Sequence, residues 1–432
     1  MSVRLTARPS PALHGTVVAP GDKSISHRAL ILGGLAAGTT HIAGLLESAD
    51  VLATAAAVRA FGADVQRGPK GWRVSGTPWR TPAADLDCGN SGTAARLLMG
   101  AAAAFALEAR FVGDASLSKR PMARVTGPLK QMGARFEGGP GLPLTLHGGG
   151  LEGIEVVAPI ASAQVKSAIL LAGLGTGAPV SVTEPVVTRD HSERMLRAFG
   201  ADVSETETPA GRRIALGPAR ALTGRTVHVP GDPSSAAFLL CAALIVPGSR
   251  VRVAGVMTNP LRTGLFETLR DMGADLGEEA ADADGAEPTA TLVAAAGELR
   301  GVEVPPGRAA SMIDEYPVLA AVAAFAHGTS VMRGVGELRV KESDRIALMI
   351  AGLRACGVEC EDGPDWFAVH GRGGDVPGGA EVDTHGDHRI AMAFLVLGLG
   401  ARAPVSVRDA DMIGTSFPGF GALMRSLGAD IA

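Results

Sequence analysis

A phrase that returns six times along the chain limits the possible folds more than any other feature. Each copy is the end of a helix, then a glycine, a small or β-branched residue and a short strand. The six glycines are Gly62, Gly133, Gly200, Gly273, Gly357 and Gly428. A glycine here permits the left-handed backbone that ends many helices. The sequence therefore predicts six copies of one structural unit.

A second phrase, also present six times, is a polar entrance followed by an apolar, alanine-rich helix. These helices are expected to start near Lys23, Asn90, Ala163, Ser234, Ile313 and His388. They are apolar nearly all round, so they should be buried. Several lead into a β-branched run, which indicates a strand. The two phrases together predict an α/β fold of βαβαββ units, three in each of two similar domains.

The domain boundaries are predicted from a repeated Val-x-x-Pro-Gly-Asp phrase. It occurs at 17–22 and again at 227–232, each time just before a buried-helix entrance. We interpret the two copies as the points where the chain passes between domains. One domain is then 22–230, and the other is discontinuous, 1–21 plus 231–432. A chain of 432 residues also exceeds the usual size of a single core.

Charge and composition argue against several classes of function. Lys and Arg total 40 against 44 Asp and Glu, a net charge of −4, which disfavours binding to nucleic acid or to an acidic membrane. We expect a soluble cytoplasmic protein, because no apolar run is long enough for a membrane span or a leader. The four cysteines include only one close pair, Cys356 and Cys360, so free buried thiols are expected and a zinc site is not.

The polar residues at the six helix entrances differ, which favours one asymmetric site over a scaffold of repeated binding surfaces. In the first entrance a glycine turn leads into Lys23 and Ser24, and Arg28 follows four residues after Ser24. The N–H groups of a helix start and two cations together favour an anion. In the second, Gly92 permits close approach by a ligand, and either Ser91 or Thr93 is suited to cap the helix.

Cations are unusually frequent at these entrances and loops. They are Lys23, Arg28, Arg120, Lys341, Arg345 and Arg389. The planar fork of arginine suits carboxylate and phosphate groups, so substrates carrying both are expected. If residues 341–345 are helical, Lys341 and Arg345 are like charges one turn apart, a pair that a bound anion would stabilise. Each residue also has an ordinary explanation as a cap or an exposed charge. His385 and the 387–389 segment suggest metal ligands, but Arg389 beside them disfavours a metal ion.

Eight dispersed motifs carry a resemblance to a known family. They are PGDKSISHRAL, DCGNSGTAARLLMG, GDASLSKRPM, ASAQVKSA, VPGDPSSAAF, IDEYP, ELRVKESDRI and GDHRIAMA. Together they resemble the 3-phosphoshikimate 1-carboxyvinyltransferases, from Pro20 to the SFPGF at 416–420. The resemblance implies an inside-out α/β barrel of two three-unit domains with the active site in the cleft between them. It also implies transfer of enolpyruvyl from phosphoenolpyruvate to the 5-hydroxyl of shikimate 3-phosphate, a step of chorismate and aromatic amino-acid biosynthesis.

The resemblance also implies the roles of individual residues. The residues expected to bind shikimate 3-phosphate are Lys23, Ser24, Arg28, Ser162, Gln164, Arg189, Asp314 and Lys341. Those expected to bind phosphoenolpyruvate are Lys23, Gly92, Arg120, Gln164, Arg345 and Arg389. We predict that Asp314 is the base and that Glu342 or Lys23 donates the proton. No metal or organic cofactor is expected, and the protein should be a monomer.

Two positions and two alternatives qualify this interpretation. Thr415 stands where many members have a lysine, and Gly92 stands where some have an alanine associated with insensitivity to glyphosate, so inhibition by glyphosate is expected.

One alternative is the related family that uses UDP-N-acetylglucosamine as acceptor, which typically has a cysteine on the loop ending in Arg-Pro. Residues 113–121 contain none. The other alternative is a repeat scaffold without catalysis.

Overall fold

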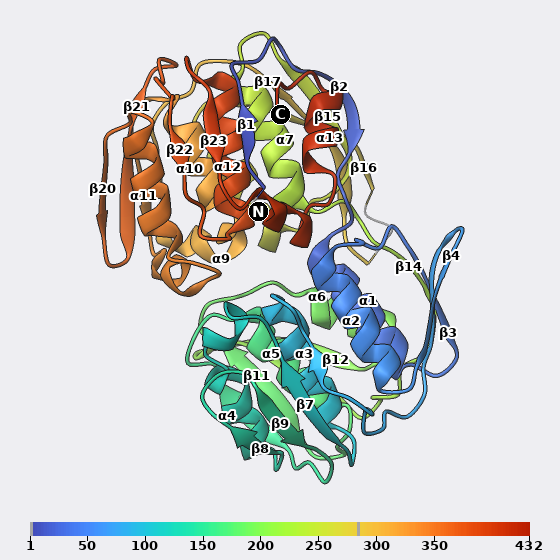
Figure 1. The fold of residues 1–432 in the computed structure, drawn as a ribbon. Helices are drawn as coiled ribbons and strands as arrows, with labels where there is room; N and C mark the ends of the chain where they lie inside the picture. The colour runs from blue at the N-terminus through green and yellow to red at the C-terminus, as the bar shows by residue number, and fades with distance from the viewer. Residues whose placement is uncertain (1–2, 283–285) are drawn as a thin grey trace. The chain divides into compact units, whose positions relative to one another are not determined.

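The computed structural model describes residues 3–282 and 286–432, and its chain forms two compact units (Figure 1). One, here called the middle unit, is Gly21–Val229. The other, the terminal unit, is Met1–Pro20 with Pro230–Ala432. Both breaks fall within the repeated Val-x-x-Pro-Gly-Asp phrase.

The middle unit contains three four-stranded sheets of one design. In the first sheet the strand order is β14 (Thr226–His228), β3 (Thr39–Ala43), β5 (Gly71–Ser75), β4 (Asp64–Gly68). In the second it is β6 (Leu86–Asp87), β7 (Glu108–Val112), β9 (Leu144–His147), β8 (Arg135–Gly138). In the third it is β10 (Ile154–Val157), β11 (Val180–Glu184), β13 (Gly211–Leu216), β12 (Val203–Thr208). In each sheet the first pair is parallel and the others are antiparallel. A parallel pair needs a crossover helix, whereas an antiparallel pair needs only a hairpin, so this pattern is the βαβαββ unit.

Six α-helices connect these strands. The central ones are α1 (Lys23–Leu35), α3 (Gly92–Ala103) and α5 (Ala163–Gly173); the others are α2 (Ala49–Ala60), α4 (Ala123–Gln131) and α6 (His191–Ala198), with a 3-10 turn η1 (Leu117–Lys119). Helix α3 packs against both α1 and α5. The central helices start within a few residues of the predicted entrances.

The terminal unit repeats this design with one shortened sheet. One four-stranded sheet has the strand order β16 (Asp275–Asp282), β17 (Thr289–Ala295), β15 (Arg250–Met257), β2 (His14–Val18). The other has the order β18 (Glu303–Val304), β19 (His327–Arg333), β21 (Trp366–Arg372), β20 (Cys360–Gly363). The shortened, three-stranded sheet has the order β1 (Leu5–Ala7), β23 (Val405–Val407), β22 (Glu381–Val382). The prediction of a short strand after the last repeated glycine, Gly428, is wrong: Ile431 makes only an isolated bridge with Ala7. Strand β1 pairs antiparallel with β23 and occupies the edge that a final hairpin would use.

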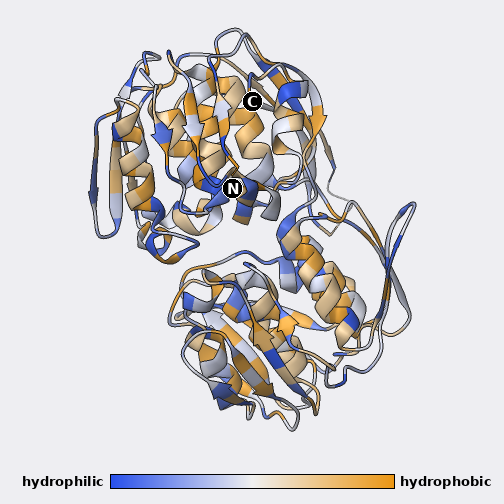
Figure 2. Ribbon diagram, in the orientation of Figure 1, coloured by the Kyte–Doolittle hydropathy of each residue, from blue (hydrophilic) through white to orange (hydrophobic). Residues whose placement is uncertain are grey.

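The helices of the terminal unit follow the same plan. The central ones are α7 (Pro233–Ile245), α10 (Tyr316–Ala323) and α12 (His388–Gly400); the others are α8 (Gly264–Asp271), α9 (Ala309–Met312), α11 (Arg345–Ala355) and α13 (Phe420–Ser426), with 3-10 turns η2 (Pro260–Arg262), η3 (Pro306–Arg308), η4 (Gly336–Val340) and η5 (Ala410–Thr415). The central three contact one another, and Figure 2 shows their largely apolar colouring. Every residue of α7 is buried. The buried central helices and the sheets of mixed strands confirm the α/β prediction.

The six repeated glycines have the conformation that the sequence predicts. Their φ angles are 115° at Gly62, 106° at Gly133, 103° at Gly200, 86° at Gly273, 78° at Gly357 and 104° at Gly428. Each one lies just after a helix that is not one of the central six: α2, α4, α6, α8, α11 and α13, in chain order. A side chain at a positive φ is strained, which explains why glycine recurs there.

The cysteine prediction is also confirmed. All four cysteines are free and buried. Burial raises the pKa of the Cys356 and Cys360 thiols to about 12, so they are protonated at neutral pH. Among helices in the part of the chain that the structure describes, none has the length and apolar character needed to cross a membrane.

The closest helix packing in the middle unit depends on Gly100. A Cβ added to this α3 residue would lie 2.4 Å from the carbonyl oxygen of Ala168 and 2.6 Å from its Cα, both in the backbone of α5. Backbone atoms cannot move aside as a flexible side chain can. Contact this close therefore requires glycine.

We predict that Gly100→Ala lowers the free energy of unfolding by about 1–3 kcal/mol, because the added methyl group overpacks the core. Denaturant unfolding followed by tryptophan fluorescence measures this loss, since Trp72 and Trp79 both lie in the middle unit. The control is Gly177→Ala, where nothing lies within 4 Å of the added Cβ. Equal stability of the two variants would contradict the packing argument.

Candidate active site

The first turn of α1 presents the cations that the sequence singled out. Asp22 caps this helix by accepting a hydrogen bond from the Ile25 N–H at 2.7 Å. The Lys23 ammonium donates to Asp50 Oδ2 at 2.8 Å, and its side chain is 20% exposed. Asp50 lies in the first turn of α2, and the sequence analysis did not identify it. It holds the Lys23 charge at the helix entrance.

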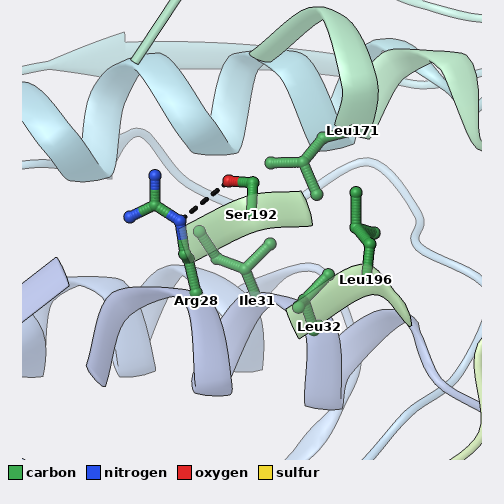
Figure 3. Close-up of a pocket in the computed structure, with 6 residues that line it drawn as sticks. All are labelled: Arg28, Ile31, Leu32, Leu171, Ser192 and Leu196. Carbon is green, nitrogen blue, oxygen red and sulfur yellow. Dashed lines mark hydrogen bonds between the residues drawn. The ribbon is translucent and has the colours of Figure 1, made fainter. Parts of the chain in front are cut away.

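Arg28 is an internal cation instead of an exposed one. Its Nε donates to Ser192 Oγ and its Nη2 to Ser167 Oγ, each at 2.8 Å, while Nη1 donates to the Ser24 carbonyl at 3.1 Å. Figure 3 shows the guanidinium beside the Ser192 hydroxyl, at one side of a small recess whose other lining residues are apolar. The recess is formed by α1, α5 and α6.

A second cluster surrounds Gly92 at the start of α3. The Arg120 Nη2 donates to Asn90 Oδ1 at 2.7 Å. Gln164 Nε2 donates to Thr93 Oγ1 at 2.8 Å, and Gln164 Oε1 accepts from Arg96. The structure thus brings together Gly92, Arg120 and Gln164, which all stand among the predicted phosphoenolpyruvate ligands.

Details of this cluster settle two points that the sequence left open. Ser91, not Thr93, caps α3, because its Oγ accepts from the Ala94 N–H at 3.1 Å. Arg120 is buried, which excludes the surface-loop explanation for this residue. Arg96 belongs to the cluster although the sequence analysis missed it: its Nη1 would lie 3.1 Å from a Cβ on Gly92. Its position four residues after Gly92, one helical turn on, was the available signal.

Two further predicted residues lie at helix starts of the middle unit. Ser162 is the N-cap residue of α5, although its side chain makes no capping hydrogen bond. Arg189 lies two residues before α6 begins at His191.

In the terminal unit, Arg345 is the centre of a dense charge cluster. Its side chain is only 1% exposed. Nε donates to Asp387 Oδ2 at 2.9 Å, Nη2 to Glu342 Oε2 at 2.6 Å, and Nη1 to Asp314 Oδ1 at 3.3 Å. Burial alone would lower the pKa of Arg345, but the three carboxylates raise it, so the guanidinium stays charged.

Two more cations approach Asp314. The Lys341 ammonium lies 3.8 Å from Asp314 Oδ1, and Arg389 Nε lies 3.9 Å from the same oxygen. Arg389 Nη1 also donates to the Asp314 carbonyl at 3.2 Å. The Asp314 carboxylate therefore lies among three cationic groups. The structure brings together all five predicted residues of this unit.

The local backbone differs from one expectation about this cluster. Lys341 and Arg345 do not share a helix, because Lys341 follows η4 with a ψ of −144° and α11 begins only at Arg345. Asp344 caps α11 by accepting from the Ala347 N–H at 3.0 Å. The repulsion argued from helical spacing therefore does not apply, and both cations instead face Asp314.

Asp387 is the anionic partner that the sequence analysis considered only as a metal ligand. It is fully buried, accepts from Arg345 and Ser343, and caps α12 through the Arg389 N–H at 2.9 Å. Burial would raise its pKa, but the Arg345 guanidinium lowers the pKa below the ordinary value of 3.8. Thr415, at the position where a lysine is common, donates its hydroxyl to the Met412 carbonyl.

Solved structures first define the class of protein. Over 99% of this chain and 98% of the other, the fold matches the enolpyruvyl transferase NikO from Streptomyces tendae with a TM-score of 0.79 at 19% identity. An EPSP synthase from Acinetobacter baumannii matches with a TM-score of 0.88 and 42% identity, covering 100% of this chain and 99% of that chain. The fold is thus the inside-out α/β fold of the enolpyruvyl transferases.

Sequence comparisons then define the family. The family model of EPSP synthase (3-phosphoshikimate 1-carboxyvinyltransferase) matches residues 7–424. The 3-phosphoshikimate 1-carboxyvinyltransferase of Phenylobacterium zucineum (strain HLK1) is 59% identical over 100% of this chain and 96% of its own length. That of Caulobacter vibrioides (strain NA1000 / CB15N) is 57% identical over 99% and 98%. The chain belongs to the EPSP synthase family.

We predict that Asp387→Asn lowers the free energy of unfolding at pH 7 by about 3 kcal/mol or more, because the Arg345 charge loses its most buried partner. Asparagine still caps α12, so the loss reports the charge and not the cap. The folded-state pKa of Asp387 is lowered, so its contribution is present above pH 3.8 and is lost as the pH falls below that value. The difference between wild type and variant should therefore shrink in acid.

Denaturant unfolding at several pH values measures this effect. The control is Asp344→Asn, the same exchange at a helix cap whose side chain is 40% exposed and pairs with Arg339. We expect the control to lose only about 1 kcal/mol or less. A pH-independent difference for Asp387→Asn would contradict the assignment.

Proposed function

We propose that this protein transfers the enolpyruvyl group of phosphoenolpyruvate to the 5-hydroxyl of shikimate 3-phosphate, releasing phosphate. Membership of the EPSP synthase family supports the reaction. The observation that carries the chemistry is the Asp314 carboxylate among Lys341, Arg345 and Arg389. The cations keep the Asp314 carboxylate ionised, so it has a free site for a proton, and the same cations can bind the anionic groups of the substrates. A cytoplasmic monomer without metal or organic cofactor remains part of the proposal.

Each unit contributes a set of residues to this proposal. In the middle unit, Lys23, Ser24, Arg28, Ser162, Gln164 and Arg189 bind shikimate 3-phosphate, and Gly92 and Arg120 bind phosphoenolpyruvate with Lys23 and Gln164. In the terminal unit, Asp314 and Lys341 bind the shikimate hydroxyls, and Arg345 and Arg389 bind phosphoenolpyruvate. The arginines support this assignment, because their guanidinium groups pair well with carboxylate and phosphate. Both sets act on the same substrate pair.

The reaction requires three proton transfers, one from the 5-hydroxyl oxygen and two at the methylene carbon. Asp314 accepts the proton of the 5-hydroxyl as that oxygen forms a bond to C2 of phosphoenolpyruvate. Glu342 or Lys23 donates a proton to the methylene carbon, which becomes a methyl group. The C2–O bond to phosphate then breaks, phosphate leaves with the bonding electrons, and a methyl proton returns to a base as the double bond reforms. Arg120, Arg345 and Arg389 stabilise the charge on carboxylate and phosphate.

Phosphate release from phosphoenolpyruvate tests the function. We expect release with shikimate 3-phosphate as acceptor and none without an acceptor. Release with UDP-N-acetylglucosamine instead would identify the related transferase reaction. Release with neither acceptor would favour the scaffold without catalysis and contradict the proposal.

We predict that Asp314→Ala lowers kcat by at least about 10²-fold, the usual contribution of a positioned general base, with substrate binding largely retained. Steady-state kinetics and calorimetric binding measure the two effects separately. Asp375→Ala is the control, because Asp375 belongs to an exposed ion pair with Arg402 in the same unit. Normal turnover by Asp314→Ala would exclude the base role.

We predict that glyphosate inhibits this enzyme competitively with phosphoenolpyruvate, and that Gly92→Ala raises the inhibition constant by at least about tenfold, a plausible cost of one methyl group in a binding site. A Cβ on Gly92 would lie 3.1 Å from Arg96 Nη1 and 3.4 Å from Arg120 Nη1. Both atoms end flexible side chains, so the variant should fold. Initial-rate measurements with both ligands varied provide the test. Unchanged sensitivity of the variant, or full activity of the wild type at glyphosate far above the KM for phosphoenolpyruvate, would contradict this.

A further inference from the structure

A buried cluster of three charged side chains lies outside the residues assigned so far. Lys166 of α5 is 1% exposed and ion-pairs with two carboxylates. Its ammonium lies 2.8 Å from Glu184 Oε2, at the end of β11, and 2.6 Å from Glu193 Oε1, in α6. The side chains of Glu184 and Glu193 are 2% and 1% exposed. Burying three charged groups costs solvation free energy, so a functional role for this triad is worth considering.

The charge balance within the triad is uneven. Burial alone would lower the pKa of Lys166, but the two glutamates raise it, so the ammonium is retained. Burial raises the pKa of Glu193, an effect that Lys166 opposes. Glu193 Oε2 has no hydrogen-bond partner among the residues that the structure describes. Only Oε1 of Glu193 therefore connects α6 to Lys166.

The triad is continuous with the hydroxyl groups that hold Arg28. Ser167 follows Lys166 in α5, and Ser192 precedes Glu193 at the start of α6. Ser192 Oγ donates to Ser167 Oγ at 2.6 Å, and Ser167 Oγ donates to the Ala163 carbonyl at 2.6 Å. Because both hydroxyl protons are used in this way, both oxygens accept from the Arg28 guanidinium.

The two helices are thus joined by two adjacent polar contacts. Lys166 pairs with Glu193, and next to them Ser167 pairs with Ser192. The first contact involves neither Arg28 nor solvent. The second fixes where the guanidinium can lie, as Figure 3 shows for Ser192. A displacement of α6 along α5 would break both contacts together.

The other carboxylate of the triad reaches the segment before α6. Glu184 accepts a hydrogen bond from the Thr188 hydroxyl and, at 3.5 Å, from the Thr188 N–H. Thr188 is buried and directly precedes Arg189, a residue assigned above to shikimate 3-phosphate. Lys166 therefore restrains the backbone on both sides of Arg189. It pairs with Glu184, which binds Thr188 just before Arg189, and with Glu193, which lies in α6 just after it.

We propose that Lys166, with Glu184 and Glu193, is a positioning residue for the shikimate 3-phosphate site: it fixes α6 against α5, so that Ser192 holds Arg28 and the 188–192 segment holds Arg189. This inference rests on the proposed function, because it takes Arg28 and Arg189 as ligands of that substrate. The triad touches neither substrate. Its effect is specific to one substrate, since the residues it positions are not those assigned to phosphoenolpyruvate.

Glu193→Met tests this role, because methionine keeps the side-chain length but removes the acceptor for Lys166. The Lys166–Glu184 pair remains, so no buried cation is left unpaired. We expect the KM for shikimate 3-phosphate to rise at least about tenfold, while the KM for phosphoenolpyruvate and kcat stay within about threefold. Glu193→Gln keeps an oxygen acceptor for Lys166 and should restore a KM near that of the wild type.

A matched control comes from another ion pair of α6, whose carboxylate partner Glu205 lies in β12. Arg197 of α6 pairs with Glu205 on a more exposed face, so Glu205→Met should leave both KM values unchanged. Thermal unfolding verifies that each variant is folded at the assay temperature. A folded Glu193→Met variant with a normal KM for shikimate 3-phosphate, or with both KM values raised equally, would overturn the inference. Wild-type enzyme inactive with shikimate 3-phosphate would instead contradict the proposed function.

Discussion

The terminal unit depends on one interaction, the buried ion pair between Arg345 and Asp387. Arg345 starts α11 and Asp387 caps α12, so the pair joins the first turns of two helices. A guanidinium that is 1% exposed has lost its hydration and needs compensating partners, and around Arg345 three carboxylates supply them. The same guanidinium also binds the carboxylates of Glu342 and Asp314, and so helps to hold both side chains in place. The same electrostatics that stabilises this part of the fold therefore places the proposed base beside Lys341 and Arg389.

The middle unit holds its cations in a different way. The Arg28 guanidinium donates hydrogen bonds to the hydroxyls of Ser192 and Ser167 and to the carbonyl of Ser24. The neighbouring carboxylates Glu184 and Glu193 both pair with Lys166. The terminal unit thus surrounds its proposed base with cations, and in the middle unit serine hydroxyls accept hydrogen bonds from Arg28. This division suits a reaction in which an anionic substrate must be bound and one hydroxyl must lose a proton.

Local signals in the sequence were enough for the repeat and for most of the candidate site. Gly62 and its five equivalents mark helix ends because a positive φ is a property of the residue's own backbone. The apolar helices were equally readable, since a helix without a polar face has to be buried. The family motifs supplied roles for residues such as Arg120 and Asp314. What the sequence could not give were pairings between distant segments: Asp50 with Lys23, and Glu193 with Lys166. The pairing of β1 with β23 also joins distant segments, so the residues near Ile431 gave no sign that this segment would form only an isolated bridge.

The central claim is that the methylene carbon of phosphoenolpyruvate gains a proton before phosphate leaves. The most direct test is to run the reaction with shikimate 3-phosphate in deuterium oxide and to analyse the product by mass spectrometry and NMR. We expect deuterium on the vinyl methylene carbon of the enolpyruvyl group, because one of the three methyl hydrogens of the intermediate comes from solvent. Product that forms at a normal rate with no deuterium on that carbon would contradict the proton transfers assigned to Asp314, Glu342 and Lys23.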